Sequence, residues 1–251
     1  IPNIISVETP QISFKQDNEL RRKLLEDESI EVGTLTRINN TLEINGIKII
    51  AITPSLEALE ILMKAYENNE IKKGEKEGGA EQISSQKENE TPLKQCILNI
   101  EKGEDIFVKD ISKPNKSSIS IIVTYKNFNG LFLADAHVED IITGIREMGY
   151  ENKKFNVTKL SHHGSEKNTN TELLELIGKT EYILCADKSK HNHPNNLTLA
   201  RLLSFDNNPT IHFSATEEKL SCLLNELATL DISIKSTFPI NNLNTILYEY
   251  K

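Results

Sequence analysis

The histidines of this 251-residue chain are the side chains best suited to do chemistry, and they are confined to its second half. Five of the six lie between Leu131 and Pro194, the sixth is His212, and none precedes His137. Histidine is the commonest metal ligand and the usual acid or base at neutral pH. The candidate chemistry of the chain therefore belongs to this half.

Ligand-forming side chains follow three successive expected strands. They are Asp135 at the end of strand 131–135, His162 and His163 after strand 155–160, and His191 and His193 after strand 182–186. In open α/β sheets, functional sites gather at the carboxyl ends of the strands. An aspartate with two or more histidines suits Zn²⁺ or Mn²⁺. Gly164, after the histidine pair, permits a tight turn beside such a site.

Alternating strands and helices surround these residues. We expect strands at 117–125, 131–135, 155–160, 182–186, 210–214, 232–236 and 245–250. We expect helices at 138–148, 172–177, 197–203 and 217–227, with Thr169 and Glu172 spaced as a capping box. This alternation predicts an α/β fold in which helices cover a sheet.

The first third of the chain reads as strands and helices followed by a polar tract. We expect a strand at 4–14, a helix at 17–31, and a hairpin of 42–44 with 47–52 across Asn45-Gly46. Ser55 is expected to cap a helix that reaches Asn69. Residues 72–92 have almost no large apolar side chains, so we expect a mobile insertion within one domain.

Composition excludes some classes of function. The net charge of −8 gives no general attraction to nucleic-acid backbones, although a local site would still allow binding. Cys96, Cys185 and Cys222 show no paired spacing and read as buried free thiols of a reducing, cytoplasmic protein. No run of 18 apolar residues predicts a membrane span. The chain begins with Ile1 rather than methionine, which suggests that an upstream segment has been removed.

Three motifs in order carry a resemblance to a known family. They are Phe132-Leu133-Ala134-Asp135-Ala136, then Lys159-Leu160-Ser161-His162-His163-Gly164-Ser165, then His193-Pro194. Together they resemble the second half of a metallo-β-lactamase-fold hydrolase, closest to the variety found in the competence protein ComEC. Residues 47–54 and 115–119 agree with this, and the resemblance covers roughly residues 40–215.

The resemblance implies an αββα sandwich, of which this chain supplies mainly the C-terminal half, with a site for two divalent metal ions, Zn or Mn. Asp135 matches the carboxylate that bridges the metals. His162 or His163 matches the last histidine ligand, and we prefer His162 because it follows the strand directly. His193 matches a general acid or phosphate contact, while His163 and Ser165 would line the pocket.

One departure from the family pattern shapes the functional hypothesis. The family's first metal motif, His-x-His-x-Asp-His, is missing, and it belongs to the N-terminal half of the fold. We therefore expect these ligands on a companion segment, in an enzyme that is split or cleaved. The implied activity is a metal-dependent phosphodiesterase or nuclease acting on DNA or RNA. The alternatives are an inactive domain that regulates or scaffolds a partner, and a hydrolase of small esters or lactones.

Each candidate residue also has a plain structural interpretation. Asp135 is suitably placed to cap the helix that follows it, and His193 to cap the helix at 197. We expect His137 and His191 on the surface, and His212 packed and hydrogen-bonded within a strand.

Overall fold

A computed structural model describes residues 23, 26, 35–67, 90–240 and 245–248 of the chain. By its internal contacts the chain divides into two units, Ile1–Thr34 and Leu35–Lys251. In the first unit only Lys23 and Glu26 are described; both are helical and lie within the expected helix 17–31. The expected strand 4–14 and most of the insertion 72–92 lie outside the described residues. All the candidate site residues belong to the second unit.

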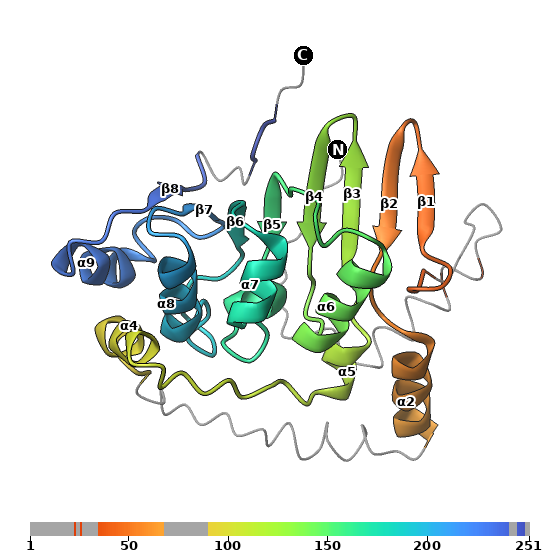
Figure 1. The fold of residues 1–251 in the computed structure, drawn as a ribbon, viewed down its shortest axis with the longest axis horizontal. Coiled ribbons are helices and arrows are strands. Elements are labelled where there is room, and N and C mark those ends of the chain that lie inside the picture. The colour runs from red at the N-terminus through yellow and green to blue at the C-terminus, as the bar shows by residue number, and fades with distance from the viewer. Residues whose placement is uncertain (1–22, 24–25, 27–34, 68–89, 241–244, 249–251) are drawn as a thin grey trace. The chain divides into compact units, whose positions relative to one another are not determined.

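The second unit is built on a mixed sheet whose eight strands lie side by side in chain order. They are β1 (Thr41–Ile44), β2 (Ile47–Ala51), β3 (Ile121–Tyr125), β4 (Phe128–Phe132), β5 (Val157–Lys159), β6 (Glu181–Leu184), β7 (Thr210–Phe213) and β8 (Lys235–Thr237). The first four strands pair antiparallel, and β4 to β8 pair parallel (Figure 1).

A helix follows each of the strands β4 to β7. These helices are α6 (Val138–Glu147), α7 (Thr171–Ile177), α8 (Asn196–Phe205) and α9 (Ser221–Thr229). Because every parallel step moves in the same direction along the sheet, right-handed crossovers put all these helices on one face. Figure 1 shows α6, α7 and α8 in a row beside the strands that they connect. The predicted α/β alternation is confirmed.

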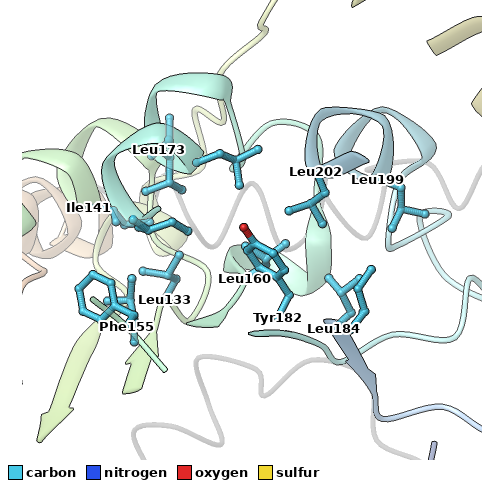
Figure 2. Packing of buried hydrophobic residues seen from close by; sticks show 14 of the residues in the cluster. Leu133, Ile141, Phe155, Leu160, Leu173, Tyr182, Leu184, Leu199 and Leu202 are labelled. Atoms are coloured by element: carbon cyan, nitrogen blue, oxygen red, sulfur yellow. The ribbon is translucent and has the colours of Figure 1, made fainter. Parts of the chain in front are cut away.

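One face of the sheet, here called the helix face, carries the hydrophobic core. Its central row joins paired residues of neighbouring strands, namely Ile50, Ile122, Leu131, Thr158, Tyr182 and Ile211. All six are at most 5% exposed. Figure 2 shows Leu133, Leu160, Tyr182 and Leu184 of this layer meeting Ile141, Leu173, Leu199 and Leu202 of the helices.

The opposite face, here called the second face, is apolar over β2, β3 and β4, and it is less covered than the helix face. Ile49, Ile121, Val123, Phe132 and Ile183 alternate with the core residues along the same strands, and all are half-buried. Toward the β1–β2 hairpin the second face is exposed, with Leu42 46%, Ile47 40% and Tyr125 38% accessible. The part of the sheet that is apolar on both faces, β2 to β4, is typical of a layer that packs on both sides.

The expected strand 117–125 begins later than predicted, because Lys113–Lys116 form a short helix, α5, that delays entry into the sheet. Its partner was predicted at 131–135 but runs from Phe128 to Phe132, so that prediction was three residues out of place. The turn between them is the residue pair Lys126-Asn127, with Lys126 at φ 52°. Ala134, at φ 46°, takes the chain out of the sheet before Asp135.

Local capping signals were predicted with mixed success. Asn45 and Gly46 form the predicted hairpin turn, at φ 52° and 80°. Ser55 Oγ accepts from the amide of Ala58 and caps α2 (Leu56–Glu67), as expected. The capping box at Thr169 was wrong, because Asn170 is the N-cap and its side chain accepts from Leu173 N at 2.9 Å.

Helix α4 (Leu93–Glu101) was not expected from the sequence; it packs beside α8. Residues 102–112 then run in an extended path to α5 (Figure 1). This path is tied down by Arg201, which donates to both oxygens of Asp105 at 2.8 Å. The expected strand 245–250 was wrong for its described part, 245–248, which is irregular. Within the described ranges, none of the helices has the length and apolar character to span a membrane.

Candidate functional site

The loops that follow β4, β5 and β6 meet at one edge of the sheet. The rings of His162 and His193 lie 5.1 Å apart, those of His162 and His163 6.1 Å, and those of His163 and His193 6.4 Å. Asp135 joins them, with its Oδ1 4.0 Å from Nε2 of His163. The structure therefore brings together the four residues that the sequence singled out from three separate loops.

Hydrogen bonds between the loops fix this convergence. The amide of His162 donates to the carbonyl of Ala134 at 2.8 Å, which ties the histidine pair to the Asp135 loop. The amide of Asn195 donates to the carbonyl of Gly164 at 3.0 Å, which ties it to the His193 loop. These backbone hydrogen bonds link the three loops to one another.

The backbone of the histidine pair is strained. His162, His163 and Gly164 adopt φ values of 45°, 60° and 85°, which are costly for residues that carry a Cβ. A Cβ on Gly164 would lie 2.8 Å from Cβ of Pro194, so the two loops touch through the glycine. Strained backbone of this kind clusters at functional sites.

His162 is anchored on one side of its ring. Its Nδ1 lies 3.2 Å from Oδ1 of Asn168, 3.4 Å from Nδ2 of Asn115 and 3.6 Å from Oδ2 of Asp110. Burial by itself lowers the pKa of His162, but the contact with Asp110 and the charges of Asp135 and Asp110 outweigh it. The pKa therefore lies above its ordinary value.

Asp110 is a site residue that sequence reasoning missed. It is 9% exposed, and its carboxylate accepts from the amide of Ser112 at 2.8 Å and from Nδ2 of Asn115 and Asn168 at 2.8 and 3.1 Å. Burial alone would raise its pKa, but these donors and His162 together lower it well below the usual range. Asp110 lies outside any periodic segment, so no local signal marks it.

His163 and Asp135 form the more open part of the site, with side chains 47% and 38% exposed. Nδ1 of His163 lies 2.8 Å from the carbonyl of Cys185, which can only accept, so Nδ1 carries the hydrogen. In the neutral ring Nε2 then holds a lone pair beside the Asp135 carboxylate. The alternative role of Asp135 as a helix cap is not seen, because His137 is the N-cap of α6 and no side chain caps it.

His193 is buried beside the other imidazoles and is 9% exposed. Its burial and the neighbouring positive groups, led by His162, lower its pKa to about 3. The ring is therefore uncharged at neutral pH and keeps one lone pair. It does not cap α8, whose N-cap is Asn195.

The remaining histidines lie apart from the cluster or at its border. The expectation that His137 is on the surface was wrong: it is 7% exposed because its Nε2 reaches the carbonyl of Ser112 at 2.9 Å under the extended path. His191 is exposed, as expected, with its ring 5.8 Å from that of His193. His212 is packed as predicted, between Thr237 at 2.7 Å and Glu181 at 3.1 Å.

Two further expectations concern small side chains. Ser165, expected to line the pocket, is 3% exposed, and its Oγ accepts from the amide of Lys167 at 3.3 Å. All three cysteines are free, but only Cys96 is buried. Burial was wrongly predicted for Cys222, which is exposed on α9 because the apolar run around it belongs to an amphipathic helix.

The donor set fits part of a metal site. Imidazole nitrogens with lone pairs and one carboxylate are the ligands that Zn²⁺ takes, and two ligands of a tetrahedral zinc ion lie roughly 3.3 Å apart. Asp135 and His163 are separated by 4.0 Å, slightly more than this. Among the described residues, no three His, Cys, Asp or Glu side chains are grouped closely enough to hold an ion. This part of the chain therefore offers suitable ligands but not a complete set.

The geometry of Asp135, His162, His163 and His193 and the three motifs that contain them are the features that characterise this site. No family model, curated protein or solved structure matches the chain.

Proposed function

We propose that this chain is the C-terminal half of a metallo-β-lactamase-fold hydrolase that works with a companion segment. The proposed substrate is a phosphodiester, DNA or RNA. The companion segment would carry the His-x-His-x-Asp-His ligands and complete an αββα sandwich. The observation that carries the proposal is the convergence of Asp135, His162, His163 and His193 from three loops onto one sheet edge.

The donors are presented in the form that a metal needs. The backbone carbonyl of Cys185 accepts a hydrogen bond from Nδ1 of His163. Nε2 of His163 is therefore available beside Asp135. Asp135 and one of the two tandem histidines would hold two divalent ions, Zn or Mn. When bound, such ions lower the pKa of water and polarise the scissile ester.

His193 has a narrower role in this proposal than the resemblance implies. Since its pKa is held near 3, the ring carries no extra proton at neutral pH. A neutral imidazole donates one hydrogen bond, which suits contact with a phosphate oxygen. Donation of a proton to a leaving group is less favoured, because the protonated form is disfavoured by burial.

The half-buried apolar residues on the second face of the sheet support the proposal of a companion segment. Ile49, Val123 and Phe132 lie on it and remain half-buried, whereas their neighbours on the helix face are covered. A second apolar layer packed here would give the two-sheet core of the sandwich, with helices on its outer faces. The net charge of −8 means that substrate affinity would come from the metal site and not from general attraction.

The test is reconstitution of the chain with a segment that bears the His-x-His-x-Asp-His motif. Hydrolysis of DNA, RNA and bis-p-nitrophenyl phosphate is measured with Zn²⁺ and with Mn²⁺, and bound metal is determined by elemental analysis. We expect Asp135→Asn to lower the rate at least roughly 100-fold. The control is Asp231→Asn, which changes an exposed turn carboxylate distant in sequence from the site. A complex without metal, or full activity of Asp135→Asn, overturns the proposal.

A regulatory or scaffolding role is the second candidate. The observation that favours it is the lack of a complete metal-binding group in the part of the chain that the structure describes. This role predicts a stable but metal-free complex whose assembly is unaffected by Asp135→Asn. The same elemental analysis therefore decides between the two.

A further inference from the structure

We propose that Asp110 and Asn168 act as a relay that fixes the tautomer of His162, with its hydrogen on Nδ1 and a lone pair on Nε2. Both are positioning residues: they act on His162 and are not proposed to contact a substrate. The tautomer of His162 is inferred from the hydrogen-bond pattern alone. Its use in holding a metal rests on the proposed function.

The first step is the orientation of the Asn168 side chain. This residue is fully buried, at 0% exposure. Its Nδ2 lies among oxygen acceptors, 3.1 Å from Oδ2 of Asp110, 3.1 Å from the carbonyl of Ala136 and 3.4 Å from that of Asp135. An amide nitrogen only donates, so these three oxygens fix which end of the amide is which. The amide oxygen must therefore face His162.

The second step is the hydrogen on His162. Oδ1 of Asn168 is 3.2 Å from Nδ1, and an amide oxygen can only accept. Oδ2 of Asp110, at 3.6 Å, adds a negative charge on the same side. Nδ2 of Asn115 is also near, but at 3.4 Å it is farther from Nδ1 than the Asn168 oxygen, and two acceptors against one donor favour a hydrogen on Nδ1. Nδ1 is therefore the donor of the ring.

The third step is what remains on the other side of the ring. His162 is 28% exposed, and within the described chain its Nε2 has no hydrogen-bond partner. The adjacent ring of His193, 5.1 Å away, belongs to the candidate site. A buried carboxylate or amide that holds the far nitrogen of a ligating histidine is the usual support of a metal ligand.

Asp110 can orient Asn168 and His162 because hydrogen bonds hold its own carboxylate in place. Ser112, Asn115 and Asn168 all donate to its carboxylate, and the fixed path 102–112 delivers it from outside the sheet. Without Asp110, Asn168 loses one of its acceptors and its orientation is less determined. The two residues therefore act as a pair.

The experiment is ¹⁵N NMR of the histidine rings in the whole chain at alkaline pH, where His162 is neutral, with the signal assigned by its loss in His162→Gln. We expect a protonated Nδ1 and an unprotonated Nε2. In Asn168→Ala and in Asp110→Asn the Nδ1–H form should fall to a minority, because an unconstrained imidazole prefers Nε2–H. The control is Asn170→Ala, which removes the cap of α7 but leaves the relay intact, so the tautomer should not change.

An Nε2–H tautomer in the unmodified chain overturns the relay, and so does an unchanged tautomer in both relay variants. If a variant fails to fold, the spectrum of the unmodified chain still decides. These outcomes need neither metal nor substrate. A correct tautomer in a protein that binds no metal would count against the proposed function alone. In a reconstituted enzyme, Asn168→Ala should weaken metal binding about 10–100-fold, whereas Asn170→Ala should not.

Discussion

The two faces of the sheet are made from alternate residues of the same strands, yet they are in different environments. Ile122 on the helix face is fully buried, whereas its neighbour Ile121 on the second face is half-buried. The helix face is completed by helices that the chain itself supplies. The second face is apolar over β2 to β4, becomes more polar toward Lys159 and His212, and has no comparable cover on its apolar part among the described residues. The apolar part of this open face is the surface that the proposed companion segment would cover.

The candidate site shows the same contrast at the edge of the sheet. His162 is held from behind by buried Asp110 and Asn168. Asp135 and His163 remain accessible, with side chains 38% and 47% exposed. The His162 part of the site has all its supporting hydrogen bonds within this chain. The part with Asp135 and His163 is accessible to ligands from outside it. Both contrasts agree with the proposed companion segment.

The largest expected effect compares the two faces directly. Ile122→Ala should lower the free energy of unfolding by about 2–5 kcal/mol, because it leaves a cavity in a packed core. Ile121→Ala, the matched change on the adjacent residue, should cost clearly less. Urea denaturation of both variants gives the comparison. Equal losses would show that the second face is as tightly packed as the helix face.

The next effect tests how closely the helices pack. A Cβ on Gly144 of α6 would lie 2.1 Å from the carbonyl oxygen of Ile52. Gly144→Ala should therefore lower the free energy of unfolding by about 1–3 kcal/mol, despite the better helix propensity of alanine. Thr143→Ala, on the exposed side of the same helix, is the control and should be nearly neutral. Thermal melts of the two variants decide, and a stabilised Gly144→Ala would contradict the close contact.

A smaller effect should appear in the pH dependence of stability. The folded pKa of His193 is about 3 and its ordinary value is 6.5, so below about pH 6.5 the unfolded chain binds a proton that the folded chain does not. Stability from this group is present above that pH and is lost as the pH falls, by about 1–2 kcal/mol between pH 7 and pH 5. Denaturant titrations at both pH values should show a smaller loss in His193→Gln.

The exposed histidine beside it provides the control for this prediction. His191→Gln should keep most of the pH dependence of the unmodified chain, because burial is the largest cause of the low His193 pKa and His191 is only one of several neighbouring charges. A pH dependence that is the same in His193→Gln as in the unmodified chain would mean that other groups cause it.

The smallest effect concerns the open end of the second face. Leu42 is 46% exposed, so Leu42→Lys should change the free energy of unfolding by less than about 0.5 kcal/mol. Ile50→Lys, on the helix face of the next strand, should instead prevent folding, because it buries a charge. A large loss of stability of Leu42→Lys in urea denaturation would place Leu42 in a packed core.

Short-range patterns predicted much of the fold. Asn45-Gly46 gave the hairpin, because both residues tolerate positive φ, and Ser55 gave the start of α2. The alternation of strands and helices gave the α/β class. The predicted ends of the strands were less accurate where a short helix or a tight turn determined them. Helix α5 delayed β3, and the turn at Ala134 ended the β4 segment before Asp135.

The site divides in the same way. The sequence by itself determined that Asp135, His162, His163 and His193 follow successive strands, and parallel strands bring such positions to one edge for any sequence that forms them. Only the tertiary structure showed that Asp110 and Asn168 reach His162 from segments 52 and six residues away along the chain. It alone showed that the two faces of the sheet are covered to different extents. Spacing along the chain specifies strand ends, but burial and long-range hydrogen bonds depend on which segments the packed helices bring together.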